Sequence, residues 1–182
     1  MNAKRTTIVA ITLVGACGGF LAARGVTPTA ASSAQQTLPR CQNIQLAITP
    51  YSSNGAAGHV GVIYRIHRTW GSTCFLKGFP GMELLDRNFG SLPNPVHWGG
   101  GVVVGNQTPR RVVLDATHDA YFAAGYGDVP VTGGTCGQAY YVMIIPPYDY
   151  LPDVTYIASN RGRLEVCGAF NASPVQATTP SP

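Results

Sequence analysis

Four cysteines set the limits of what this chain can fold into. Cys41 and Cys74 lie in its first half, and Cys136 and Cys167 lie in its second. No pair has the short C-x-x-C spacing of zinc or redox sites, and thiols spaced in this way outside the cytosol usually form structural disulfides. Only 11% of the residues are charged. We therefore expect cross-links to help hold together a body that is rich in valine, tyrosine and glycine.

Four cysteines can pair in three ways. We favour Cys41–Cys74 and Cys136–Cys167, because these two bridges would fasten the two ends of the body. They would close loops of 33 and 31 residues. Loop-closure entropy then gives about 3–4 kcal/mol of stabilisation for each bridge.

Residues 1–24 have the features of an export leader. The basic pair Lys4-Arg5 precedes Thr6–Ala16, an uncharged stretch of 11 residues, which is typical of a signal peptide. Val14–Cys17 resembles a bacterial lipoprotein cleavage box, in which Cys17 would carry the lipid. An ordinary cleaved signal peptide and an uncleaved anchor are the alternatives. All three place the body outside the cytoplasm.

The rest of the chain divides into a linker, one domain and a tail. Residues 25–40 are rich in Thr, Ala, Ser and Gln and contain two prolines, which predicts a disordered linker. Residues 173–182 are predicted to form a disordered tail. Residues 41–172 between them have the length of a single domain.

The net charge of +4 belongs mostly to the leader. Three of the 12 basic residues lie there, so the chain from residue 35 onward has nine basic residues against eight acidic ones. A nucleic-acid partner is not expected, because nucleic-acid binding requires clustered Lys and Arg. Arg110-Arg111 is interpreted as a solvated strand end.

The apolar pattern of the body has a period of two. Val60, Val62, Tyr64 and Ile66 alternate with other residues, as do Ile44, Leu46 and Ile48, which is typical of strands with one buried face. About nine short strands separated by Gly and Pro turns indicate an all-β fold, an immunoglobulin-like β-sandwich. The other strands are predicted at Cys74–Leu76, Gly81–Leu85, Val102–Val104, Arg111–Leu114, Ala120–Ala124, Ala139–Ile145, Val154–Ile157 and Leu164–Phe170.

Several blocks of the body resemble a known family. They include Gly55–Gly58, Cys74–Gly81 and Ile145–Pro147, and together with the four cysteines they occur in the order of the secreted or lipid-anchored actinobacterial family known as domain of unknown function 4232. The resemblance runs from Cys41 to about Pro174. It implies an extracytoplasmic β-sandwich with two disulfides, and it supplies no catalytic residues. His67–Trp70 departs from the pattern of the family.

Exposed aromatic residues are the best candidates for a binding surface. The loop Pro146–Pro152 carries Tyr148 and Tyr150, and its tyrosines cannot all be buried. His97 and Trp98 lie in another Gly/Pro-rich loop. Tyr and Trp are favoured at recognition surfaces because they combine an apolar ring with a polar tip. We predict that these four residues form a contact surface.

A reaction centre is not predicted. His118 with Asp115 or Asp119 could form a loop-built site, but the chain has no nucleophile elbow, zinc-protease motif or phosphate loop. His59 and His67 would stand roughly 26 Å apart on one strand, so they cannot share a metal. No catalytic residue, metal or cofactor is therefore expected.

These observations predict a non-enzymatic module of the cell envelope that binds a partner protein, a glycan or a lipid. We expect a monomer that touches the membrane only through its leader or a lipid. The alternative is a hydrolase or metal-handling protein with a loop-built His/Asp site.

Overall fold

The computed structural model describes residues 37–130, 134–156 and 163–180. The leader, Cys17 and most of the predicted linker lie outside the described residues. The described part contains eleven strands, one short helix α1 (Gly101–Val104) and the 3-10 helix η1 (Asn43–Gln45). The strands are β1 (Leu46–Ala56), β2 (His59–Arg68), β3 (Cys74–Leu76), β4 (Gly81–Leu85), β5 (Val96–Trp98), β6 (Val112–Leu114), β7 (Ala120–Gly127), β8 (Cys136–Ala139), β9 (Tyr141–Ile145), β10 (Asp153–Tyr156) and β11 (Leu164–Ala172).

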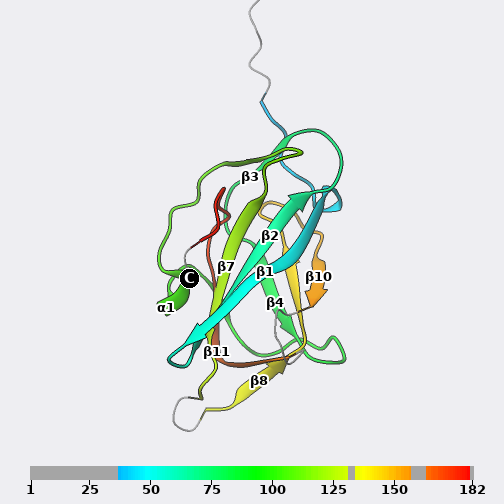
Figure 1. The fold of residues 1–182 in the computed structure, drawn as a ribbon. Helices are drawn as coiled ribbons and strands as arrows, with labels where there is room; N and C mark the ends of the chain where they lie inside the picture. Colours follow the sequence, from blue (N-terminus) through cyan, green and yellow to red (C-terminus); the bar gives the residue numbers. More distant parts are fainter. Residues whose placement is uncertain (1–36, 131–133, 157–162, 181–182) are drawn as a thin grey trace, which may run out of the picture. The chain divides into compact units, whose positions relative to one another are not determined.

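The strands form three sheets (Figure 1). A six-stranded sheet has the order β1-β2-β7-β11-β5, with β8 also paired to β11. A three-stranded sheet has the order β10-β9-β4, and β3 pairs with β6 in a sheet of two. Every pairing between these strands is antiparallel except that of β11 with β5.

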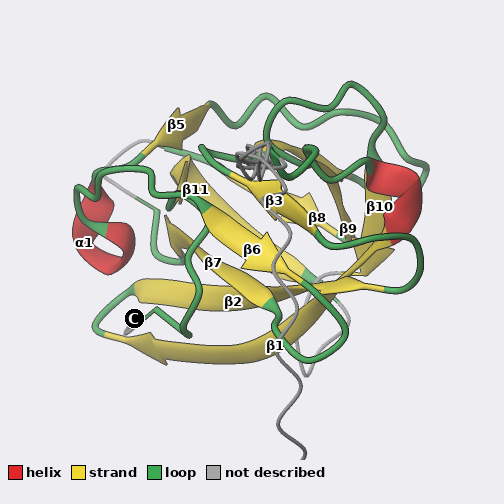
Figure 2. Ribbon diagram, turned by 90° about the horizontal axis from the view of Figure 1, so that it is seen from above, coloured by secondary structure: helices red, strands yellow, loops and turns green. Residues whose placement is uncertain are grey.

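Buried hydrophobic side chains from all three sheets, whose strands Figure 2 shows from above, form one core in the described residues. From the large sheet, Tyr64 of β2 and Phe122 of β7 enter it with their rings stacked at 5.0 Å. Leu114 of β6 and Ile144 of β9 come from the two small sheets, and all four side chains are fully buried. The alternation that predicted β2 thus reflects one strand face turned to this core.

The predicted β character and both disulfides are confirmed, with eleven strands in place of about nine. Cys41–Cys74 ties the start of the domain to β3, and Cys136–Cys167 joins β8 to β11. Disulfides of this kind are consistent with an oxidising compartment. Within the described residues, no helix has both the length and the apolarity needed to cross a bilayer.

Three strand predictions need correction. Ile44 was predicted to lie in a strand with Leu46 and Ile48, but it lies in the 3-10 helix η1, and β1 begins at Leu46. Val102–Val104, predicted as a strand, belongs to α1, because Gly99, Gly100 and Gly101 all have positive φ angles and turn the chain before the valines. Ala139–Ile145 was expected to be one strand. It breaks at Tyr140 into β8 and β9, which lie in different sheets.

The prediction of a disordered tail over residues 173–182 is wrong for its first four residues. Ser173 and Val175 are buried, and Gln176 forms two backbone hydrogen bonds of 2.8 Å with Tyr121. Packing against the core outweighs the polar composition of this segment. The domain therefore extends beyond Ala172 to at least Gln176.

Replacing both cysteines of one bridge tests the cross-links. We expect Cys41→Ser/Cys74→Ser to lower the free energy of unfolding by about 3–4 kcal/mol, and Cys136→Ser/Cys167→Ser to lower it by a similar amount, because the two loops have similar lengths. Urea unfolding of the oxidised proteins measures both. A loss below about 1 kcal/mol in either variant would contradict this role.

A second substitution tests the tail. The Ser173 hydroxyl accepts a hydrogen bond from the Ala123 N–H at 2.9 Å in a buried position. Ser173→Ala leaves that N–H without this acceptor, so we expect a loss of about 1–3 kcal/mol in urea unfolding. Thr178→Ala, at an exposed position in the same tail, should change stability by no more than about 0.5 kcal/mol. Equal effects would show that the tail does not contribute to the core.

Candidate functional site

The structure brings two of the four predicted binding residues into one groove. Trp98, the last residue of β5, and Tyr148, in the loop after β9, line a groove of about 570 Å³ together with Phe79. We call this the aromatic groove. Its other lining residues are Lys77, Gly78, Gly81, Pro109, Ile145, Pro146, Pro147 and Asp149.

The rings of the aromatic groove are exposed yet held in place. Trp98 is 68% exposed and Tyr148 is 58% exposed. Phe79 stacks on Trp98 with 5.9 Å between ring centroids and an interplanar angle of 13°. The Arg40 guanidinium lies 4.1 Å from the centroid of the Tyr148 ring, within the range of a cation–π interaction. Each ring therefore has one supporting neighbour and remains accessible to a ligand.

The Tyr148 loop is shaped by two prolines and one carboxylate. Pro146-Pro147 follows β9 at once, where proline cannot donate to a strand ladder, and Tyr148 adopts a left-handed φ of 66°. The Asp149 carboxylate accepts hydrogen bonds from the backbone N–H groups of Tyr150 and Leu151 in the same loop and of Asn43 in η1. Burial alone would raise the pKa of Asp149, but these three donors lower its pKa below the ordinary value.

The other two predicted residues lie outside the lining of this groove. The prediction that His97 and Trp98 lie in a loop is wrong, because both belong to the short strand β5, which pairs with β11, and His97 is exposed there. Tyr150 is 92% exposed. Only its backbone N–H supports the groove, by donating a hydrogen bond to the Asp149 carboxylate. Phe79 and Lys77 were missed as site residues. Their segment stood out in the sequence only as a block of family resemblance, although its Gly78-Phe79-Pro80 run contains an aromatic residue at a chain turn.

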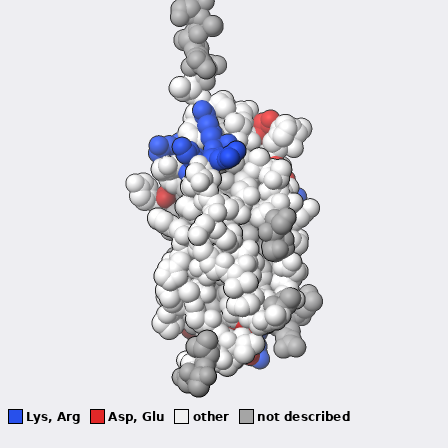
Figure 3. All heavy atoms as spheres, turned by 90° about the vertical axis from the view of Figure 1, so that its left-hand side faces the viewer, with Lys and Arg blue, Asp and Glu red and all other residues white. Residues whose placement is uncertain are grey.

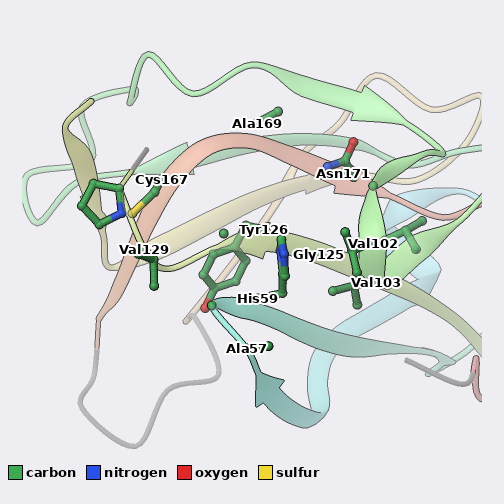
Figure 4. Close-up of a pocket in the computed structure, with 15 residues that line it drawn as sticks. Ala57, His59, Val102, Val103, Gly125, Tyr126, Val129, Cys167, Ala169 and Asn171 are labelled. Atoms are coloured by element: carbon green, nitrogen blue, oxygen red, sulfur yellow. The ribbon is translucent and has the colours of Figure 1, made fainter. Parts of the chain in front are cut away.

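A second cavity lies beside α1. It has a volume of about 490 Å³, and only His59, Tyr126 and Asn171 among its lining residues carry polar side chains. In Figure 4, Val102 and Val103 flank one side of this cavity and Val129 the other. α1 approaches β7 at Gly125, where an added Cβ would lie 2.7 Å from the Cβ of Val103. The sequence pattern did not indicate this cavity, because it depends on α1.

Two histidine–aspartate pairs form, but neither lines the groove or the α1 cavity. His67 Nδ1 lies 2.6 Å from Asp119, and His118 Nδ1 lies 2.8 Å from Asp115. The Thr117 hydroxyl also contacts His118 at Nδ1, 3.1 Å away. In a hydrolytic triad the carboxylate and the nucleophile occupy opposite ring nitrogens. At His118, Asp115 and Thr117 contact the same ring nitrogen, Nδ1. Asp115 also accepts hydrogen bonds from the backbone N–H groups of Thr117 and His118, which closes a turn before β7.

In the ranges that the structure describes, no three His, Cys, Asp or Glu side chains lie close enough together to hold an ion.

Comparison with known proteins gives one match. A family model described as "Domain of unknown function (DUF4232)" matches residues 41–176. The matched span begins at the first disulfide cysteine and ends at Gln176, so it includes the buried continuation after Ala172. No curated protein and no solved structure matches the chain.

Protonation of Asp149 at low pH should destabilise the fold at the groove. Because its pKa is lowered in the folded state, its carboxylate stabilises the fold fully above the ordinary Asp pKa of about 3.9 and loses that effect as the pH falls through the lowered value. We expect Asp149→Ala to lower the urea midpoint at pH 6 and to differ less from the unmodified chain near pH 2. At pH 6 the urea midpoint of Asp149→Asn should lie between those of Asp149→Ala and the unmodified chain, because the amide keeps one acceptor oxygen. An equal effect of Asp149→Ala at both pH values would contradict this role of the charge.

Proposed function

The chain belongs to the DUF4232 family, whose description assigns no activity, and we propose that it is an exported, non-enzymatic binding module of the cell envelope. The aromatic groove is the observation that carries this proposal. Two largely exposed rings, Trp98 and Tyr148, lie in a single concave site, and exposed aromatic residues in such sites are frequent anchors for ligands.

The groove is prepared for binding before a ligand arrives. Phe79 fixes the plane of Trp98, and the bonds of Asp149 fix the loop that carries Tyr148. Little conformational entropy of the groove would therefore be lost when a ligand binds, and such a loss weakens many associations.

The chemistry of the groove favours binding over catalysis. Its titratable side chains are Lys77, Tyr148 and Asp149, and the Asp149 carboxylate already accepts three backbone hydrogen bonds. A general base needs a free lone pair directed at the substrate. No nucleophile–base pair is present in this lining, which supports a role in recognition.

The envelope location is supported by the two disulfides and by the leader sequence. Cleavage of an ordinary signal peptide would release the domain outside the cytoplasm, and lipidation at Cys17 would hold it on the outer face of the membrane, as the resemblance to actinobacterial exported proteins suggests. We also infer that the layers around the core form a sandwich of immunoglobulin-like type. In such sandwiches, the loops at the ends of the sheets commonly carry the binding surface.

Fluorescence of Trp98 tests the groove directly. The chain has two tryptophans, so Trp70→Phe leaves Trp98 as the only reporter. The probes are vesicles of phosphatidylglycerol and phosphatidylcholine, soluble peptidoglycan fragments and a proline-rich peptide. We expect at least one probe to shift the emission to shorter wavelength, because the ring leaves water. We expect Tyr148→Ala to weaken that binding by roughly tenfold or more.

Tyr51→Ala is the matched control. Tyr51 is 54% exposed, close to the exposure of Tyr148, but it does not line the groove. It should leave the affinity within about twofold. If no probe changes the Trp98 emission, or if the two tyrosine variants lose affinity equally, the groove is not the binding site.

A further inference from the structure

Basic side chains gather at one end of the domain. Arg40, Lys77, Arg110 and Arg111 are all exposed, and we call them the basic end. Figure 3 shows Lys and Arg side chains clustered near one end of the domain. Within the described residues, none of the four forms a salt bridge with a carboxylate. Their charge is therefore available to an anionic partner.

Contacts connect these residues to each other and to the aromatic groove. The Arg111 guanidinium lies 4.0 Å from the centroid of the Phe75 ring, and the Phe75 N–H donates to the Pro39 carbonyl at 3.0 Å. Arg40 follows Pro39 and covers one face of Tyr148. Lys77 is itself part of the groove lining. Two of the four basic residues, Arg40 and Lys77, thus contact the groove, and Arg110 directly follows Pro109 of its lining.

Apolar and aromatic side chains are exposed around the same end. The Trp70 indole N–H donates to the Ile44 carbonyl at 2.7 Å, and both side chains are more than half exposed. Asn43, the neighbour of Ile44, donates to Asp149, which places Tyr150 and Leu151 nearby with exposed side chains. Trp and Tyr together with Lys and Arg are the residues that proteins place at membrane–water interfaces.

The basic end also includes the start of the described domain, because Arg40 lies three residues after the first described residue. Residues 25–36, between the predicted leader and the first described residue, number 12. If the leader or a lipid at Cys17 holds the chain in a membrane, Arg40 is among the first residues of the domain beyond this tether. The end next to the membrane would then carry the unpaired positive charge.

We propose that the basic end docks on the headgroups of an anionic membrane, and that a lipid surface is the ligand of the aromatic groove. This inference rests on the proposed binding function and names its ligand. Each Lys or Arg near an anionic bilayer strengthens binding by about fivefold, equivalent to about 1 kcal/mol. The exposed rings of Trp98 and Tyr148 would lie at the headgroup level.

The test compares two variants with the same change in net charge. Lys77→Glu/Arg110→Glu alters the basic end. Arg87→Glu/Arg163→Glu reverses two charges outside the groove lining: Arg87 donates to the Tyr140 hydroxyl, and Arg163 lies 3.9 Å from the Glu165 carboxylate. Partition of the full chain into phosphatidylglycerol-containing vesicles is measured against pure phosphatidylcholine vesicles. Any binding through the leader is common to all the proteins and cancels in the ratio between variants.

We expect Lys77→Glu/Arg110→Glu to reduce partition into the anionic vesicles by roughly 25-fold or more, while Arg87→Glu/Arg163→Glu reduces it by less than about fivefold. The difference should vanish near 1 M salt, where charges are screened within about 3 Å. Equal losses in the two variants would overturn the inference. So would a Trp98 emission that responds to the peptidoglycan fragments or the peptide but not to anionic vesicles, an outcome that leaves the proposed function intact.

Discussion

The Cys41–Cys74 disulfide is the constraint on which the proposed binding surface depends. It holds the start of the domain beside β3, where the Phe75 N–H bonds to the Pro39 carbonyl. From that position Arg40 covers the Tyr148 ring, and the Asn43 N–H donates to Asp149. The groove is therefore assembled from segments distant in the sequence, and a covalent bond limits how far one of them can move away.

The sequence predicted those parts of the fold in which the local pattern of apolar residues follows directly from burial. The alternation along β2 corresponds to one face in the core, and the spacing of the cysteines indicated both bridges. The pattern failed for Val102–Val104, whose β-branched side chains favour strands, because the backbone of the preceding glycines turns the chain. The pattern also failed for Val175. One apolar residue within a polar segment forms no pattern, so the sequence did not indicate that its side chain is buried in the core.

The binding site was predictable in part for a similar reason. Trp98 and Tyr148 were found because large aromatic residues in proline-rich segments have few ways to be buried. Phe79 joins them only because the turn between β3 and β4 passes beneath Trp98. The basic end could not be predicted at all: its members are spread over 72 residues from Arg40 to Arg111. The Arg110-Arg111 pair alone has the appearance of a solvated strand end, and only the fold gives it basic neighbours.

Hydrogen–deuterium exchange of the full chain, with and without phosphatidylglycerol vesicles, tests the central claim most directly because it locates the bound surface without a substitution. The account predicts slower exchange in the segments around Gly78–Phe79 and Tyr148–Leu151. It also predicts unchanged exchange at α1 and in the neighbouring part of β7. Slower exchange at α1 and β7 instead, or no change at either place while the protein is bound to the vesicles, would contradict it.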